Sequence, residues 1–480
     1  MVANAAEMQM TDSEIGRMKE LFEKQCSAYN NAPMPSAEQR IDHLKRLKDA
    51  TIKYQDKLAD AVYQDFSCRS KNETLIAEIL TSVQGIKDAI KHTKKWMKPS
   101  KRKVGMLFAP AKNQVVYQPV GVVGIIVPWN YPIFLALGPL TAALAAGNRA
   151  LIKMSEFTPA LNKVFKAMLA EAFEENRVAV IEGEAEVAAA FSEMPFNHIL
   201  FTGSTNVGRY VMAAAAKNLT PVTLELGGKS PSIVSSHVPM KDAAERICYG
   251  KSVNAGQTCV APDYVLVPKD KENEFVEAYR KAFNKMYPTL QNNEDYTAII
   301  NERQYQRLKD WLKDAKDKGA KLTELNPANE DLSGTRKMAP TLVQNQKDDM
   351  IVAEQELFGP ILPIITYNSI DEALNYINAR PRPLALYYFG YNQDEADYVL
   401  ANTHSGGVSI NDTLKHLAQD DMPFGGVGDS GMGHYHGKEG FITFSHAKSV
   451  HRVGKLATGG LIYPPYKSSV ISTLKTFFIR

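Results

Sequence analysis

The feature that most constrains the fold is a regular alternation of short apolar runs with helix-like segments, which begins at Gly121. Residues 121–127 form a continuous run of Val, Ile and Gly, typical of a strand that is buried on both faces of a parallel sheet. The same pattern predicts strands at 150–154, 178–181 and 197–201, and helices at 139–146, 158–175 and 184–192. Strands that alternate with helices favour an α/β fold with a doubly wound parallel sheet.

A second alternation starts at Leu226 and predicts another α/β unit. Its expected strands are 232–234, 263–267, 361–367 and 384–389, and its expected helices are 241–252, 271–286 and 303–318. Residues 321–337 are polar and are expected to be irregular. Residues 443–453 are expected to form a strand that pairs with a neighbouring subunit.

The N-terminal segment, residues 11–97, is expected to form three helices. Ser36 and Gln39 have the spacing of a capping box at the start of the second helix. No pattern in this segment indicates chemistry.

Composition sets broad limits on function. A chain of 480 residues with 44% apolar residues can bury more than one core, which predicts two or three domains. A net charge of +3 with dispersed Lys and Arg argues against a nucleic-acid partner. The four cysteines form no C-x-x-C pair and no cluster with metal-ligand spacing, so we expect no metal and a reducing compartment.

No segment has the pattern of a membrane anchor or a secretion signal. The N-terminus lacks a basic region followed by an apolar one, and the longest mostly apolar run, 133–146, is shorter than the ~20 residues that span a bilayer. We therefore predict a cytoplasmic protein without a transmembrane span. The C-terminal tail, 459–480, contains an amphipathic segment that we expect to pack on the protein, with contact to a membrane surface as the alternative.

One cysteine, Cys259, stands on a glycine-containing turn (NAGQTCV, residues 254–260) between a predicted helix and a predicted strand. Such a loop is where a nucleophilic thiol is typically placed, although a free cysteine is also a common inert core residue. Upstream, Glu225 in LELGGK and Asn130 in PWNYP supply a carboxylate and a side-chain amide. Nucleophile, base and oxyanion donor are the three parts of covalent acyl chemistry.

Seven sequence blocks, in order between residues 128 and 433, resemble the NAD(P)-dependent aldehyde dehydrogenases. They are PWNYP at 128–132, the run 153–156, FTGST at 201–205 followed by Gly208, LELGGKSP at 224–231, GQTCVAP at 256–262, ELFGP at 356–360 and PFGGVGDSGMG at 423–433. Residues 213–231 and 434–446 most resemble the class-three branch, which includes bacterial coniferyl aldehyde dehydrogenases.

The resemblance implies a dinucleotide site at the block that starts with Phe201. FTGSTNVG is not the general G-x-G-x-x-G fingerprint, but Gly203 and Gly208 leave room for close backbone approach. A helix N-terminus favours phosphate, and in the family's arrangement Ser204 would contact the pyrophosphate.

The resemblance also implies contacts to the two riboses of NAD or NADP. Lys153 and Glu156 would reach the adenosine ribose, Glu356 would hold the nicotinamide ribose, and Phe358 would lie beside the nicotinamide ring. From the residues alone, the alternatives are a surface lysine at a strand end for Lys153 and a carboxylate at a helix end for Glu356.

The reaction implied is the NAD(P)-dependent oxidation of an aldehyde to the acid through a cysteine thiohemiacetal and a thioester. Two alternatives remain: an acylating enzyme that passes the acyl group to coenzyme A or phosphate, and a non-catalytic binding protein on the same fold. For the substrate, Tyr131, Thr258 and Val260 would line an aromatic or apolar pocket suited to an aryl aldehyde such as coniferyl aldehyde, unless they are plain core.

The resemblance further implies a homodimer or homotetramer with an oligomerisation arm. We expect the domains to divide as follows: a dinucleotide-binding domain at 1–103 and 121–225, a catalytic domain at 226–420, the arm and a bridging region at 104–120 and 421–458, and the tail at 459–480.

Overall fold

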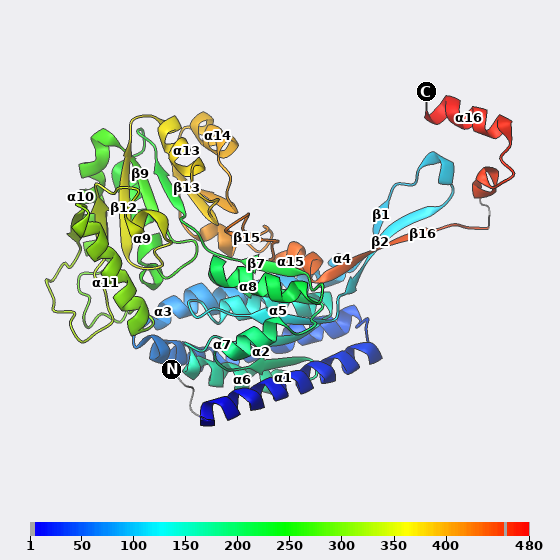
Figure 1. Cartoon of the computed structure of the whole chain (residues 1–480), viewed down its shortest axis with the longest axis horizontal. Coiled ribbons are helices and arrows are strands. Elements are labelled where there is room, and N and C mark those ends of the chain that lie inside the picture. The colour runs from blue at the N-terminus through cyan, green and yellow to red at the C-terminus, as the bar shows by residue number, and fades with distance from the viewer. Residues whose placement is uncertain (1–4, 456–457, 480) are drawn as a thin grey trace.

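The structure, a computed structural model, describes residues 5–455 and 458–479. The outermost residues of the predicted ranges (1–4 and 480) and residues 456–457 therefore lie outside the described part of the chain. Within that part the strands form a six-stranded, a seven-stranded and a three-stranded sheet. Figure 1 shows the two large sheets in the body of the molecule and the small sheet in an arm that projects from it. The α/β fold class is confirmed.

The six-stranded sheet is built by the first predicted alternation. Its order is β15 (Gly431–Met432), β7 (Val222–Glu225), β6 (His198–Thr202), β3 (Val122–Ile126), β4 (Arg149–Lys153) and β5 (Val178–Ile181). All neighbours are parallel except β15, which is antiparallel to β7. Strands β3 to β6 are fully buried, as continuous apolar runs indicate.

The helices of this unit are α5 (Phe134–Ala146), α6 (Pro159–Ala172), α7 (Ala185–Ser192) and α8 (Thr205–Ala216). Helix α5 starts five residues before the predicted start at Pro139, which lies inside the helix. A proline in a helix interior removes one backbone hydrogen bond. Nearly every side chain of α5 is buried, so tertiary packing outweighs that loss.

The seven-stranded sheet is built by the second alternation. Its order is β10 (Lys321–Glu324), β11 (Thr341–Gln344), β12 (Ile361–Tyr367), β9 (Tyr264–Pro268), β8 (Pro231–Val234), β13 (Ala385–Phe389) and β14 (Gly407–Ile410). The expectation that 321–337 is irregular is wrong for β10, which pairs antiparallel with β11 at the sheet edge. Its helices include α9 (Met240–Ser252), α10 (Glu272–Met286), α11 (Glu302–Asp317), α12 (Ile351–Glu354), α13 (Ile370–Asn378) and α14 (Gln393–Asn402).

The N-terminal segment forms α1 (Ala5–Asn31), α2 (Ala37–Phe66) and α4 (Thr81–Trp96), as expected. The predicted capping box is confirmed, because Ser36 Oγ accepts from the Gln39 amide and Gln39 Oε1 accepts from the Ser36 amide. Between α2 and α4 lie a short helix, α3 (Lys71–Thr74), and a π-helical turn at Leu75–Leu80 that the sequence patterns did not indicate.

The arm consists of β1 (Ser100–Arg102), β2 (Lys112–Pro119) and β16 (Ser445–Arg452), with β2 antiparallel to both neighbours. Residues 100–102 pair with β2, so the sheet of the arm starts before residue 104. Strand β16 pairs with β2 on one side and is an edge strand of this sheet, so its expected pairing with a neighbouring subunit stays a prediction.

The tail ends in α16 (Ser468–Phe478), which lies beyond the arm, far from the body (Figure 1). Where the structure describes it, α16 contains no buried residue, so the expectation that it packs on the protein is wrong for its own chain. Among the described helices, none is both long and apolar enough to cross a bilayer.

Candidate active site

The loop that carries Cys259 lies between α9 and β9, at the amino end of β9. It begins with three consecutive residues at positive φ: Asn254 (52°), Ala255 (51°) and Gly256 (74°). The Gln257 side chain holds the loop in place: Nε2 donates to the Asn254 and Ala298 carbonyls at 2.9 and 3.1 Å, and Oε1 accepts from the Ile300 amide at 3.0 Å. The thiol is therefore presented on a strained backbone that its neighbours keep fixed.

Asn130 and Tyr131 reach this loop from the carboxyl end of β3. Asn130 Nδ2 donates to the Gln257 carbonyl at 3.1 Å, and Tyr131 Oη lies 3.0 Å from Thr258 Oγ1. An amide nitrogen carries two hydrogens, so one hydrogen of Asn130 remains for a further acceptor. The structure thus brings Asn130, Tyr131 and Thr258 together at the Cys259 loop.

Glu225 ends β7 and is only 2% exposed. Neither carboxyl oxygen has a hydrogen-bond partner within residues 5–455 and 458–479, and burial raises the pKa of this carboxyl well above its usual range. Its backbone carbonyl accepts from the Gly203 amide at 3.0 Å, which links it to the predicted phosphate loop. Burial therefore favours the neutral form of Glu225 over the carboxylate.

Burial also controls the Cys259 thiol. It raises the pKa of Cys259 to about 12, with smaller upward contributions from Glu356 and Glu225, while the backbone N–H groups of Cys259 and Val260 act in the opposite direction. No cation is among the groups that shift this pKa.

Val260 differs from the other two predicted substrate contacts. Its side chain is fully buried in the main apolar core, and its carbonyl accepts from Tyr387 Oη at 2.5 Å. This placement favours the core interpretation for Val260, whereas Tyr131 and Thr258 retain polar groups at the site.

The predicted phosphate loop joins β6 to α8. Ser204 caps α8, accepting from the Val207 amide at 3.4 Å. A Cβ at Gly203 would lie 2.4 Å from the Phe201 ring, and one at Gly208 would lie 2.6 Å from Leu226, so close packing requires glycine at both positions. A helix N-terminus at the carboxyl end of a buried parallel strand suits a phosphate.

Lys153 and Glu156 follow the carboxyl end of β4, on the same edge of the sheet. Lys153 is 2% exposed, so the surface-lysine interpretation is wrong. Its Nζ donates to the Met154 carbonyl at 2.8 Å and lies 4.0 Å from Glu156 Oε2. Burial lowers the pKa of Lys153.

Glu356 follows α12, and its carboxyl group meets the backbone at Gly227, where an added Cβ would lie 2.1 Å from Oε2. Oε1 has no partner among the described residues, and burial with the nearby Asp263 raises the pKa of Glu356 to about 8. Phe358 has a φ of +47°, and its ring packs edge-on against Trp129 with centroids 5.3 Å apart.

These features fit a dinucleotide. The glycine-lined helix start can accept the pyrophosphate, Glu156 and Lys153 stand where a ribose could be bonded, and the unpartnered Glu356 oxygen is a free acceptor for hydroxyl groups. All these residues lie at the carboxyl edge of the six-stranded sheet or in the loops that meet it, which is the usual crevice for a nucleotide.

Three charged residues that the sequence patterns did not single out also lie against the site: Arg69, Glu73 and Glu78. Arg69 donates to the Asn130 carbonyl, and Glu73 accepts from the Asn254 amide. Their spacing along the chain resembles an ordinary solvated helix face, so only the long-range contacts distinguish them.

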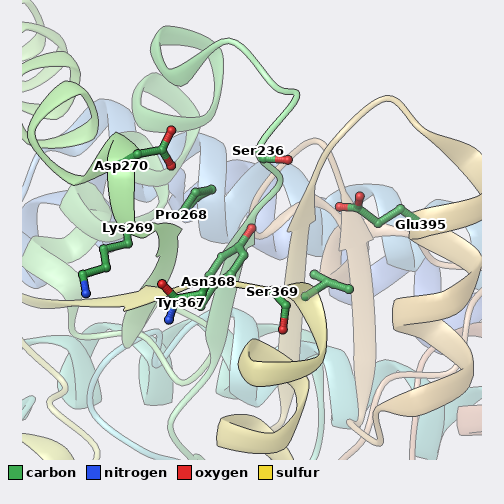
Figure 2. A pocket seen from close by; sticks show the side chains of 9 residues that line it. Ser236, Pro268, Lys269, Asp270, Tyr367, Asn368, Ser369 and Glu395 are labelled. Atoms are coloured by element: carbon green, nitrogen blue, oxygen red, sulfur yellow. The ribbon is translucent and has the colours of Figure 1, made fainter.

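A surface cavity of about 490 Å³ lies elsewhere and holds none of the candidate residues (Figure 2). It opens at the carboxyl ends of β9 and β12, where Pro268 and Tyr367 line it. Cys259 precedes the amino end of β9, so the cavity is at the opposite edge of the seven-stranded sheet.

The comparisons with known proteins agree with this geometry. Residues 6–450 match the family model described as the aldehyde dehydrogenase family. The chain belongs to the aldehyde dehydrogenase family. It is 57% identical over 480 residues to a probable coniferyl aldehyde dehydrogenase of Pseudomonas aeruginosa, covering all of both chains.

Two solved structures are similar over most of their length. A substrate-bound Staphylococcus aureus AldH has a TM-score of 0.91 and 40% identity, covering 96% of this chain and 99% of that one. A Mycobacterium tuberculosis aldehyde dehydrogenase in complex with NAD+ has a TM-score of 0.81 and 27% identity, covering 89% and 88%. The protein is thus an NAD(P)-dependent enzyme that oxidises aldehydes, with a cofactor of the NAD type.

Proposed function

We propose that Cys259 is the nucleophile, Asn130 an oxyanion donor and Glu225 the base of this aldehyde oxidation. The observation that carries the proposal is the hydrogen bond from Asn130 Nδ2 to the Gln257 carbonyl, because it places a spare amide hydrogen beside the Cys259 loop. Addition of the Cys259 thiolate to the aldehyde carbon forms a thiohemiacetal oxyanion, which Asn130 Nδ2 and the Cys259 backbone N–H stabilise.

Nicotinamide supplies, when bound, the acceptor for the hydride that the thiohemiacetal carbon loses. The resulting thioester keeps the acyl group on Cys259 Sγ. Water attacks the thioester carbon, Glu225 takes the proton of that water, and the acid leaves with the thiol restored. Glu356 and Phe358 are proposed to hold the nicotinamide half, and Lys153, Glu156, Gly203, Ser204 and Gly208 the adenosine diphosphate half.

For the substrate we propose an aryl or apolar aldehyde such as coniferyl aldehyde. Tyr131 and Thr258 offer an aromatic ring and hydroxyl groups at the Cys259 loop, and Phe134 lies three residues after Tyr131 at the start of α5. The 57% identical relative carries the name of a probable coniferyl aldehyde dehydrogenase.

The first test is an NADH-formation assay with a panel of aldehydes and without coenzyme A or phosphate. We expect turnover with aryl aldehydes, because Glu225 permits hydrolysis of the thioester by water. Cys259→Ala should lose the activity and keep cofactor affinity within a few-fold. Turnover that requires coenzyme A would establish the acylating alternative, and oxidation by Cys259→Ala at the wild-type rate would remove Cys259 as nucleophile.

Glu225→Gln should separate acylation from hydrolysis. In rapid mixing we expect the first equivalent of NADH to form, followed by slow turnover, because the amide cannot take a proton from water. The raised pKa of Glu225 also sets the pH dependence. Only the ionised carboxylate is a base, so wild-type turnover should fall as the pH drops through a pKa above the usual ~4.3.

In the Glu225→Gln variant, turnover measured against pH should lack this fall at low pH. Glu245→Gln, on the outer part of α9, is the matched control. This variant should keep the wild-type turnover rate and its fall at low pH. A variant without a burst would place Glu225 before the thioester, and normal turnover would show that another base acts.

We also propose that NAD is preferred over NADP. Glu156 is partly exposed at the proposed adenosine ribose, and its carboxylate would repel a 2′-phosphate, while Lys153 at 4.0 Å offers partial compensation. Glu156→Gln should therefore raise kcat/KM with NADP relative to NAD, whereas the exposed Glu302→Gln on α11 should not. A wild-type preference for NADP, or an unchanged ratio in Glu156→Gln, would argue against this position for Glu156.

We propose that the arm and α16 contact a second copy, giving a homodimer or homotetramer. Large apolar side chains are exposed in the arm, in the tail before α16 and at the end of α16: Met106, Phe108, Tyr463, Phe477 and Ile479. Burial of such side chains in an interface is favourable. Light scattering should give a multiple of the 53.2 kDa chain, and the double substitution Phe477→Asp/Ile479→Asp should lower the mass. A monomeric wild type would contradict this.

We place the enzyme in the cytoplasm as a further proposal. Cys26, Cys68, Cys248 and Cys259 are all free in the structure, which suits a reducing compartment. A catalytic thiol requires such conditions to stay reduced.

A further inference from the structure

We propose that Arg69, Glu73 and Glu78 together position Asn130 against the Cys259 loop, so that stabilisation of the oxyanion depends on charges in the N-terminal helices. The inference rests on the proposed roles of Asn130 and Cys259. None of the three residues reaches the reacting atoms in this proposal, so each is a positioning residue that acts through the two loops.

The loop after β3 is held by two of these charges. Arg69 Nη1 donates to the Asn130 carbonyl at 2.6 Å. Glu78 Oε2 accepts from the backbone amides of Ile133 and Phe134 at 2.8 and 3.1 Å. The backbone is thereby fixed on both sides of Tyr131, and with it the direction of the Asn130 side chain.

The Cys259 loop is held by Glu73 and by a network of hydrogen bonds that joins it to Asn130. Glu73 Oε2 accepts from the Asn254 amide at 3.1 Å. Asn254 Nδ2 then donates to the Asn130 and Gln257 carbonyls at 3.0 and 3.1 Å, and Asn130 Nδ2 donates to the same Gln257 carbonyl. The Asn130 carbonyl thus receives one donor from Arg69 and one from the Cys259 loop.

The charges lie close together in a mostly buried cluster, in which Glu73 is 13% exposed and the contacts between Arg69 and the two carboxylates are ion pairs without hydrogen-bond geometry. Arg69 and Glu78 side chains are both 0% exposed, with Arg69 Nη2 3.1 Å from Glu78 Oε1 and Arg69 Nε 3.7 Å from Glu73 Oε1. The guanidinium also lies over the rings of Phe66 and Tyr131, at 5.2 and 4.6 Å from their centroids. Tyr131 thereby links Arg69 directly to Thr258, the residue before Cys259.

A buried cluster of ions contributes little to the stability of the fold, because desolvation offsets most of the Coulomb attraction. An apolar replacement is often as stable. Burial raises the pKa of both Glu73 and Glu78, and Arg69 is the largest influence in the opposite direction. The cluster provides instead a defined geometry, since each charge has a backbone group or partner that it must face.

The π-helical turn at Leu75–Leu80 explains how both carboxylates reach Arg69. Glu73 and Glu78 are five residues apart, and an α-helix with about 3.6 residues per turn would place them on different faces. The i→i+5 pairing of a π-helix brings such residues closer to one face, and π-turns occur frequently at functional sites.

The test compares Arg69→Lys with Arg40→Met in rapid mixing of enzyme, NAD and aldehyde. Lysine keeps the charge but not the planar fork of arginine, so the Asn130 carbonyl loses its orientation. We expect the first equivalent of NADH to form at least about tenfold more slowly in Arg69→Lys, with KM within about twofold and little change in melting temperature. Arg40 is an equally buried arginine that binds the Ala145 and Ala146 carbonyls away from both loops.

Arg40→Met should therefore lower the melting temperature and leave the burst rate of the folded enzyme unchanged. If Arg69→Lys does not fold, Glu78→Gln serves the same purpose, because the amide oxygen can still accept from Ile133 while the ion pair is lost. The burst rate of Glu78→Gln should then fall by a similar factor.

A double-mutant cycle separates positioning from a general structural effect. Asn130→Ala should slow the burst by ~10²–10³-fold, and Arg69→Lys should add little to it, because the group that it positions is already gone. A wild-type burst in Arg69→Lys, or additive effects in the double variant, would overturn the positioning. A wild-type burst in Asn130→Ala would remove the proposed role of Asn130 as well.

Discussion

The proposed site depends on a few hydrogen bonds between the two halves of the body, among them the bond from Asn130 Nδ2 to the Gln257 carbonyl. Asn130 follows β3 of the six-stranded sheet, and Gln257 precedes β9 of the seven-stranded sheet. A bond of about 3 Å between them requires the two sheets to hold a fixed relative position. The positive-φ residues before Cys259 and the buried ion cluster beneath Asn130 both serve that alignment.

Much of the fold could be predicted because buried parallel strands have a strong local signal. The runs at 178–181 and 361–367 form strands with those bounds. The wrong secondary-structure predictions occur where the local sequence pattern and the tertiary packing favour different structures. Helix α5 continues through Gly138 and Pro139 because its surroundings bury it, and β10 is a polar edge strand whose partner, rather than its composition, makes it a strand.

The sequence allowed prediction of those site residues that stand in recognisable motifs. Cys259, Glu225 and Asn130 stand in short motifs, and the structure places the buried Asn130 at the loop of the partly exposed Cys259 and buries Glu225 at the end of β7. The positioning residues were not predictable, since Arg69 and Glu73 have the i,i+4 spacing of a solvated helix pair. Their burial follows from contacts with residues at 130 and 254, far along the chain.

The burial of Cys259 also bears on how the enzyme survives oxidants. Peroxides and related oxidants attack the thiolate, so their rate on a cysteine follows its ionised fraction. Burial raises the pKa of the Cys259 thiol to about 12, which favours its protonated form. The environment that raises the pKa of Cys259 therefore also slows its oxidation between turnovers.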